Sequence, residues 1–191
     1  MKKSFCILLL TLAAVTLHAQ KQGIGLRLGE PIGFTYKKYL PNNRAVEFGL
    51  GSAPRNWNST YYINSFEDRY KNYDHLSHRV KNTVYLQGRY LIHNNLNTQG
   101  IEGKLDWYWG VGLVLKTARV EYRYRDELPP RDNIYRDTRT DIDFGPEIIG
   151  GLEYTFEDVP LAVFGELSLQ VEITDRQTIR LLGGLGVRYN F

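Results

Sequence analysis

Four polar residues that lie close together in the sequence carry the side chains best suited to chemistry: Asp74, His75, Ser77 and His78. A hydrolase needs a nucleophile, an oriented base and an oxyanion site brought together, and neighbouring loop residues do not supply that arrangement. The spacing of the two histidines could also hold a metal ion, but a zinc site needs at least a third protein ligand. We therefore expect a solvated pair of loop histidines, with no catalytic residues, no metal and no cofactor.

A second set of charged residues alternates with apolar residues at a period of two. This period is typical of a β-strand that has one apolar and one polar face. Charges gathered on the inner faces of closely packed strands would be costly if they were unpaired. We expect them to form a structural network of ion pairs and hydrogen bonds, with a proton or ion path as the alternative. The seven residues singled out are Arg27, Lys37, Glu47, Arg89, Glu147, Glu166 and Arg188.

The elements that must position these charges are eight segments of alternating polarity separated by turn signals. The last is the clearest, because apolar residues from Ile179 to Phe191 alternate with polar or small ones, and the segment ends on an aromatic residue. In order, the predicted strands are 23–29, 32–40, 45–51, 83–92, 104–115, 142–156, 161–173 and 179–191.

The amino terminus has the composition of a secretion signal. Lys2 and Lys3 precede a mostly apolar stretch over 5–17, and we place the cleavage after Ala19. The apolar stretch is shorter than the roughly 20 residues that a membrane-spanning helix needs, which disfavours an uncleaved anchor. We expect residues 1–19 to be a signal peptide and 20–191 to be one domain. Since Cys6 is the single cysteine, no disulfide is expected in that domain.

Charge excludes one class of partner. The chain has 24 lysines and arginines against 21 acidic residues, and the predicted signal removes Lys2 and Lys3. A nearly neutral domain argues against nucleic acid, because phosphate binding needs clustered positive charge. The negative mean hydropathy of −0.39 is compatible with membrane insertion if half of each strand faces a polar interior.

These observations predict an all-β fold, an eight-stranded antiparallel up-and-down transmembrane β-barrel. The strand number is even and the apolar faces point outward, as in bacterial barrels. An interior of this width is filled by side chains, so we expect no open pore. A soluble lipocalin-like barrel, the alternative, would point its apolar faces inward.

The alternating strands, the secretion signal and the aromatic carboxy terminus resemble the OmpA/OmpX-type small outer-membrane β-barrels, in a divergent form. The resemblance covers nearly the whole chain after residue 19, and it brings no catalytic motif. It implies a location in the bacterial outer membrane, contact with outer-membrane lipid, and insertion by the barrel-assembly machinery. In this family that machinery recognises the carboxy-terminal strand, here with Tyr189 and Phe191 as the assembly signal.

Two long connections, 52–82 and 116–141, are the candidates for function, because binding residues often lie on loops held by a rigid scaffold. We expect their aromatic residues either to bind an extracellular protein or glycan, or to pack on one another and shield the barrel mouth. Alternation persists from Arg119 to Arg139 and predicts a projecting β-hairpin. The apolar positions switch parity there, which suggests a β-bulge. The candidate binding residues are Trp57, Tyr61, Tyr62, Tyr70, Tyr122 and Tyr124.

The sequence thus indicates a non-enzymatic outer-membrane barrel with a filled polar lumen and extracellular loops for surface recognition or protection. The alternative is a barrel enzyme that modifies lipid A. Such an enzyme should place a serine, a histidine and an acid together at the outer rim near the lipid boundary.

Overall fold

The computed structural model describes residues 21–53, 59–97, 100, 102–130, 132–174 and 177–191. The predicted signal peptide, residues 1–19, and the candidate binding residue Trp57 lie outside the described residues.

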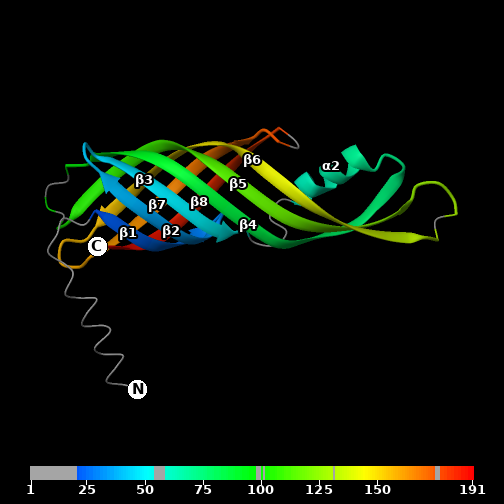
Figure 1. The fold of residues 1–191 in the computed structure, drawn as a ribbon, viewed down its shortest axis with the longest axis horizontal. Helices are drawn as coiled ribbons and strands as arrows, with labels where there is room; N and C mark the ends of the chain where they lie inside the picture. Colours follow the sequence, from blue (N-terminus) through cyan, green and yellow to red (C-terminus); the bar gives the residue numbers. More distant parts are fainter. Residues whose placement is uncertain (1–20, 54–58, 98–99, 101, 131, 175–176) are drawn as a thin grey trace, which may run out of the picture.

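Eight antiparallel strands form a closed barrel in which each strand pairs with its neighbours in sequence (Figure 1). The ring closes where the first strand pairs with the last. There the backbone N–H of Gln22 donates to the carbonyl of Phe191 at 3.1 Å, and the N–H of Phe191 donates to the carbonyl of Gln22 at 2.7 Å. Closure leaves the barrel wall without a free strand edge. The predicted fold class is confirmed. The strands are β1 (Gln22–Gly29), β2 (Ile32–Leu40), β3 (Arg44–Ser52), β4 (Tyr73–Asn95), β5 (Lys104–Asp126), β6 (Ile134–Thr155), β7 (Leu161–Glu172) and β8 (Thr178–Asn190).

The apolar faces of the strands point outward, as predicted. On β8, Leu181 and Leu185 are 66% and 69% exposed, whereas Arg180 and Arg188 are 7% and 1% exposed. The same alternation of exposed and buried residues runs along β7. A lipocalin-like barrel would have the opposite arrangement, so that alternative is excluded.

Beyond the barrel, β4, β5 and β6 continue as a three-stranded sheet, which we call the projecting sheet (Figure 1). The predicted hairpin is confirmed, because Arg125 of β5 pairs with Ile134 of β6. The expected loop over 52–82 is wrong in two respects. Helix α2 (Ser59–Arg69) forms within it, and β4 starts at Tyr73, which pairs with Asp126. No helix among the described residues is long and apolar enough to cross a membrane.

The parity switch in β5 has a different cause from the expected bulge. β5 pairs with β6 without interruption, and the register shift between Lys81 and Val84 lies in the pairing of β4 with β5. Even-numbered residues of β5 face inward along its whole length. Inside the barrel they are polar or small except for Val114, whereas Val120 and Tyr122 are apolar because α2 covers that face of the projecting sheet. The parity switch therefore reflects a change in what the inward face of β5 packs against, and not a bulge in β5.

The outward orientation of β8 makes a direct prediction about stability. Leu185→Arg places a cation on the lipid-facing wall near the centre of β8, and we expect it to destabilise the folded barrel by about 2–4 kcal/mol. The matched control is Leu128→Arg in the turn between β5 and β6, where Leu128 is 77% exposed and a change of less than about 0.5 kcal/mol is expected. Urea unfolding in lipid vesicles measures both, and equal losses would contradict the assignment of the wall.

Candidate functional site: the lumen and the projecting sheet

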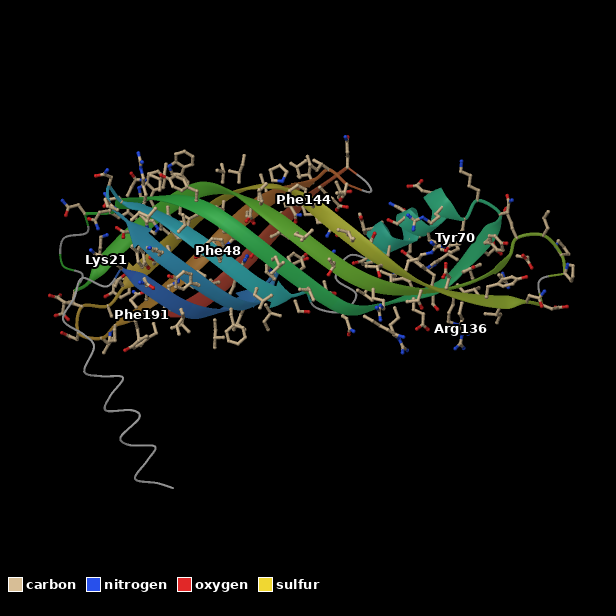
Figure 2. All side chains as sticks on the ribbon, in the orientation of Figure 1. Lys21, Phe48, Tyr70, Arg136, Phe144 and Phe191 are labelled. Atoms are coloured by element: carbon tan, nitrogen blue, oxygen red, sulfur yellow. The ribbon has the colours of Figure 1, made fainter. Side chains whose placement is uncertain are left out.

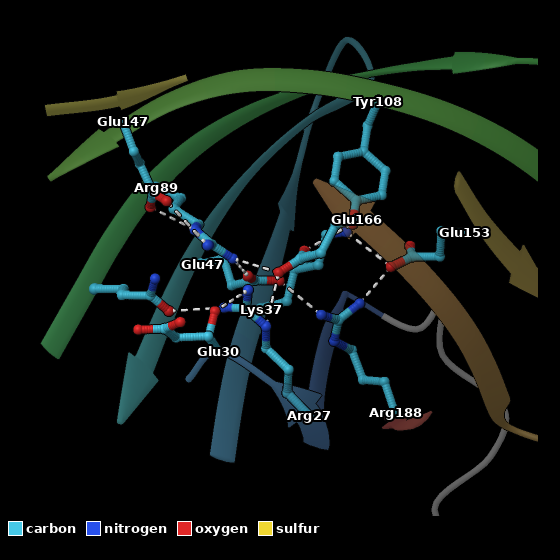
Figure 3. A network of polar contacts seen from close by, with 11 residues as sticks. Arg27, Glu30, Lys37, Glu47, Arg89, Tyr108, Glu147, Glu153, Glu166 and Arg188 are labelled. Carbon is cyan, nitrogen blue, oxygen red and sulfur yellow. Dashed lines mark hydrogen bonds and ion pairs between the residues drawn. The ribbon is translucent and has the colours of Figure 1, made fainter. Parts of the chain in front are cut away.

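Arg89 lies at the centre of the lumen and contacts three glutamates (Figure 3). Its Nε lies 2.7 Å from Glu147 Oε1, and its Nη1 lies 3.1 Å from Glu47 Oε1 and 2.9 Å from Glu166 Oε1. All four side chains are at most 2% exposed. Strands β3, β4, β6 and β7 supply them, so this one guanidinium joins widely separated parts of the barrel wall.

Two further basic side chains extend the network toward the end of the barrel where Lys21 and Phe191 lie (Figure 2). Arg188 of β8 lies 2.6 Å from Glu47 Oε2 and also pairs with Glu153. Lys37 Nζ lies 2.8 Å from Glu153 Oε2 and 4.7 Å from the centre of the Tyr108 ring. Each carboxylate therefore binds more than one donor, which offsets the free-energy cost of burying its charge.

Arg27 extends the network toward the opposite end. Its guanidinium lies 3.0 Å from Glu166 Oε1 and donates a hydrogen bond of 2.9 Å to Gln87 Oε1. Space for this side chain depends on Gly184 of the adjacent β8, because a Cβ there would clash with the Arg27 guanidinium. The Tyr108 hydroxyl donates to the second oxygen of Glu166 at 2.9 Å.

All seven charged residues predicted for the lumen are brought together in this network, and the eighth member is Glu153. Arg27, Lys37, Arg89 and Arg188 face four glutamates. The charges of these eight residues balance, and their side chains fill the centre of the lumen.

A second polar cluster lies at the mouth of the lumen under α2. Lys116 Nζ and Arg180 Nη2 lie 2.9 and 3.3 Å from Asp143 Oδ2, and Arg180 also lies 2.9 Å from Glu172. Tyr61 of α2 enters this cluster and donates to Glu172 Oε1 at 2.6 Å. Its ring centre lies 4.5 Å from the Arg180 guanidinium, a cation–π contact. The helix therefore closes the mouth through Tyr61.

Sequence reasoning missed this contact. Lys116 and Tyr61 both fall in segments expected to be loops, and nothing in the sequence indicates that a tyrosine from the connection after β3 reaches an acidic cluster formed by β6 and β7.

The candidate binding tyrosines do not form an exposed surface. Tyr61, Tyr62 and Tyr122 are 4%, 3% and 5% exposed and form a hydrophobic core with Phe66, while Tyr70 and Tyr124 pack against it half-buried. Their expected role as exposed contact residues is wrong for the three buried rings. Helix α2 lies on the inner face of the projecting sheet, with Tyr70 on that side and Arg136 on the other (Figure 2).

His75 and His78 also belong to this aromatic core and not to a solvated loop. The His75 ring centre lies 5.2 Å from that of Phe66, and His78 Nδ1 lies 3.2 Å from His75 Nε2. Burial lowers the pKa of both imidazoles, and the neighbouring His75 lowers the pKa of His78 further. Within the described residues, no three His, Cys, Asp or Glu side chains gather closely enough to hold a metal ion.

The residues expected to serve as the assembly signal lie at the end of β8. The rings of Tyr189 and Phe191 stack with their centres 6.4 Å apart, and Phe191 is 41% exposed at the barrel rim near Lys21 (Figure 2).

The molecule is a closed eight-stranded barrel with an apolar outside and a charged, filled inside, which is the fold of the small outer-membrane barrels that its sequence resembles. No family model matches the chain, and no curated protein matches it. It is similar to the solved N-terminal β-barrel domain of Pseudomonas aeruginosa OprF, with 17% identity and a TM-score of 0.48. A major outer membrane protein from Thermus thermophilus gives 13% identity and the same TM-score. Each alignment covers 91% of this chain and 100% of the other.

The central position of Arg89 predicts a large effect on stability. Arg89→Leu leaves three buried glutamates without their shared cation, and we expect a loss of about 3–5 kcal/mol in the free energy of unfolding. Lys81→Met, which breaks the exposed pair with Glu121 in the projecting sheet, should have a far smaller effect, because solvent screens exposed ion pairs. Urea titrations of the refolded proteins compare the two, and a loss at Arg89 as small as that at Lys81 would argue against the network as a structural core.

Proposed function

We propose that the protein is an integral protein of the bacterial outer membrane that neither conducts ions nor catalyses a reaction, and that supports a rigid sheet above the membrane. The observation that carries the proposal is the distribution of polarity: apolar side chains cover the outside of the wall while charged side chains are buried inside. Water would favour the reverse arrangement, whereas a lipid bilayer favours this one.

The outer wall supports contact with lipid. A shallow apolar hollow of about 870 Å³ spans β1 to β6, and its lining includes Leu26, Phe34, Phe48, Leu86 and Leu113, each between 47% and 67% exposed. Exposed apolar surface of this extent is a liability in a water-soluble protein, whereas acyl chains cover it at no cost in a bilayer. The proposed occupant of this hollow is therefore the surrounding lipid.

The balanced lumen supports a non-conducting barrel. Arg89 and its glutamates occupy the middle, and Tyr61 closes the mouth above them. To pass through the lumen, an ion would have to separate these ion pairs. Their separation would leave buried charges without partners, which is costly in free energy.

The positions of the histidines favour this proposal over a lipid-modifying enzyme. His75 and His78 pack into the aromatic core, and His93 stacks on Tyr108 at a distance of 5.1 Å between ring centres. These are the three histidines in the described part of the chain. None of them lies on the outer wall, where an enzyme would meet its lipid substrate.

Protection and recognition fall to different parts of the projection. Helix α2 shields the mouth, since its tyrosines are buried. Recognition of an extracellular protein or glycan falls to the tip, where Leu128, Ile134 and Tyr135 are 77%, 56% and 38% exposed. These residues replace the buried tyrosines as the candidate contacts.

We expect no steady ion conductance when the purified barrel is inserted into planar bilayers. The matched control is a variant with Arg27, Arg89, Glu147 and Glu166 all replaced by Ala, which keeps the net charge but empties the centre of the lumen and should admit ions. Stable openings of the unaltered protein, at a frequency similar to that of the control, would contradict the proposal.

The proposed topology can be tested on intact cells. Proteinase K, which cuts with little sequence preference, should cut the turn at 126–133 and leave the barrel in the membrane, because that turn lies at the far end of the projecting sheet. The connection between the end of β4 at Asn95 and the start of β5 at Lys104 should be protected, because it belongs to the end of the barrel where Lys21 and Phe191 lie (Figure 2). Cleavage there, with protection of the tip, would show that the barrel is inserted the other way round.

A further inference from the structure

The outer face of the projecting sheet, opposite α2, carries an unbalanced set of basic residues. On this face Lys81 pairs in register with Arg119, Arg79 with Glu121, and Arg123 with Arg136. Arg79, Arg119, Arg123 and Arg136 are all exposed. We call these four arginines, together with Lys81, the basic face.

Little acidic charge is available to neutralise the basic face. Glu121 pairs with Lys81, whose hydrogen bond and charge lower the pKa of Glu121. The neighbouring Arg125 is neutralised by Asp74 at 3.3 Å. Among the residues that the structure describes, none of the four arginines of the basic face has a carboxylate within ion-pair distance.

The register of the strands makes this arrangement unfavourable in the absence of an anion. Arg123 and Arg136 are direct cross-strand neighbours, as are Lys81 and Arg119. Side chains directly opposite each other have Cβ atoms about 5 Å apart, and like charges at that distance destabilise a sheet. An anion between them would turn two repulsive pairs into two binding pairs.

A hollow for such an anion is present. It has a volume of about 410 Å³ and is lined by Ser77, His78, Arg79, Glu121, Arg123 and Arg136. Three guanidinium groups and one hydroxyl therefore border a single concavity. Guanidinium groups bind phosphate through paired, parallel hydrogen bonds, which makes phosphate the anion that fits best.

The height of the basic face above the apolar wall indicates which kind of molecule would bring a phosphate to it. The last apolar row on the outer wall is Val84 and Ile142, which flank Thr117, and Arg119 follows two residues further along β5. At about 3.4 Å per residue, Arg119 lies roughly 7 Å beyond this row along the strand and Arg123 roughly 20 Å beyond it.

A phospholipid headgroup layer adds only about 5–8 Å on each side of the hydrocarbon. A strand tilt of about 40° brings Arg123 to a height of roughly 15 Å above the apolar row. A phospholipid headgroup layer is thinner than this height, so it reaches the Lys81 and Arg119 pair but not Arg123. A headgroup that reaches both pairs must be taller, as a chain of phosphorylated sugars is.

We propose that the basic face binds the phosphorylated saccharide headgroup of a glycolipid in the leaflet that surrounds the projecting sheet. The proposal rests on the proposed function, because it requires the barrel to lie in a membrane with the sheet on its outer side. The bound headgroup neutralises the arginine pairs and fixes the projecting sheet relative to the membrane surface.

The test uses the full-length mature protein refolded in detergent and titrated with fluorescent rough lipopolysaccharide. Replacing Arg79, Arg123 and Arg136 by Gln should weaken the affinity at least tenfold. The matched control replaces Lys21, Lys38 and Arg44 by Gln, removing the same charge from the opposite end of the barrel, and should change the affinity by less than twofold. Lipopolysaccharide stripped of its phosphates should bind the unaltered protein as weakly as the intact lipid binds the triple variant.

Three outcomes of the lipid titrations would overturn the inference. They are an unchanged affinity in the triple variant, an equal loss in the control, and binding of phosphatidylglycerol vesicles as tight as that of the glycolipid. A soluble sulfated polysaccharide that binds with the same affinity would also overturn it, by assigning the face to a soluble glycan.

Two further measurements separate this inference from the proposed function. The gel shift between unboiled and boiled samples shows whether each variant is folded, and replacing like-charged neighbours by Gln should not lower its midpoint temperature. Flotation with phosphatidylcholine vesicles tests membrane insertion alone. If the protein floats but binds both forms of lipopolysaccharide equally, only the proposed binding of the glycolipid is contradicted. If the protein does not float, the proposed function itself is contradicted.

Discussion

The pairing of Arg89 with Glu47, Glu147 and Glu166 is the interaction on which the rest of the structure depends. A narrow barrel with an apolar outside has only its interior in which to place polar side chains, and charges placed there lose most of their hydration. Their burial is tolerable only when every charge has a partner at short range. Since the partners come from different strands, satisfying them also holds the strands in one register, because a slip by one residue would turn each of these charges toward the outer wall.

The same constraint explains why the two ends of β5 are so different. Inside the barrel its inward residues meet side chains of strands that are not its neighbours, as Tyr108 does when its hydroxyl donates to Glu166 of β7. Above the wall no opposite strands remain, so the inward face of the projecting sheet must be covered by another element. Helix α2 provides that cover with Tyr62 and Phe66, while Tyr61 connects the aromatic core to the polar cluster below it.

Much of the barrel can be predicted from the sequence, because alternation in a strand directly reports which face points out of the barrel. The strand number, the outward face of Leu185 and the inward position of Arg188 all follow from this one periodicity. The seven lumen charges could be predicted as a set, but their partners could not, because side chains from strands distant in sequence meet only after the barrel closes. Glu153, for example, binds Lys37 across 116 residues of sequence.

The projection is harder to predict for a related physical reason. Alternation between 73 and 82 is weak, since inward His75 and His78 are polar residues that the aromatic core accommodates. Helix α2 is equally hard to recognise, because its buried face consists of tyrosines that suit a binding surface as well as a core. Only the position of α2 decides between these two roles for the tyrosines.

The uninterrupted course of β5 has a mechanical consequence. This strand of 23 residues passes from the wall into the projecting sheet with its β6 pairing intact. A pull on the tip therefore loads a long series of backbone hydrogen bonds in shear, and there is no hinge between wall and sheet on this pair of strands at which the load could be released. The closed barrel acts as the anchor, and the projection transmits force to it as a stiff lever.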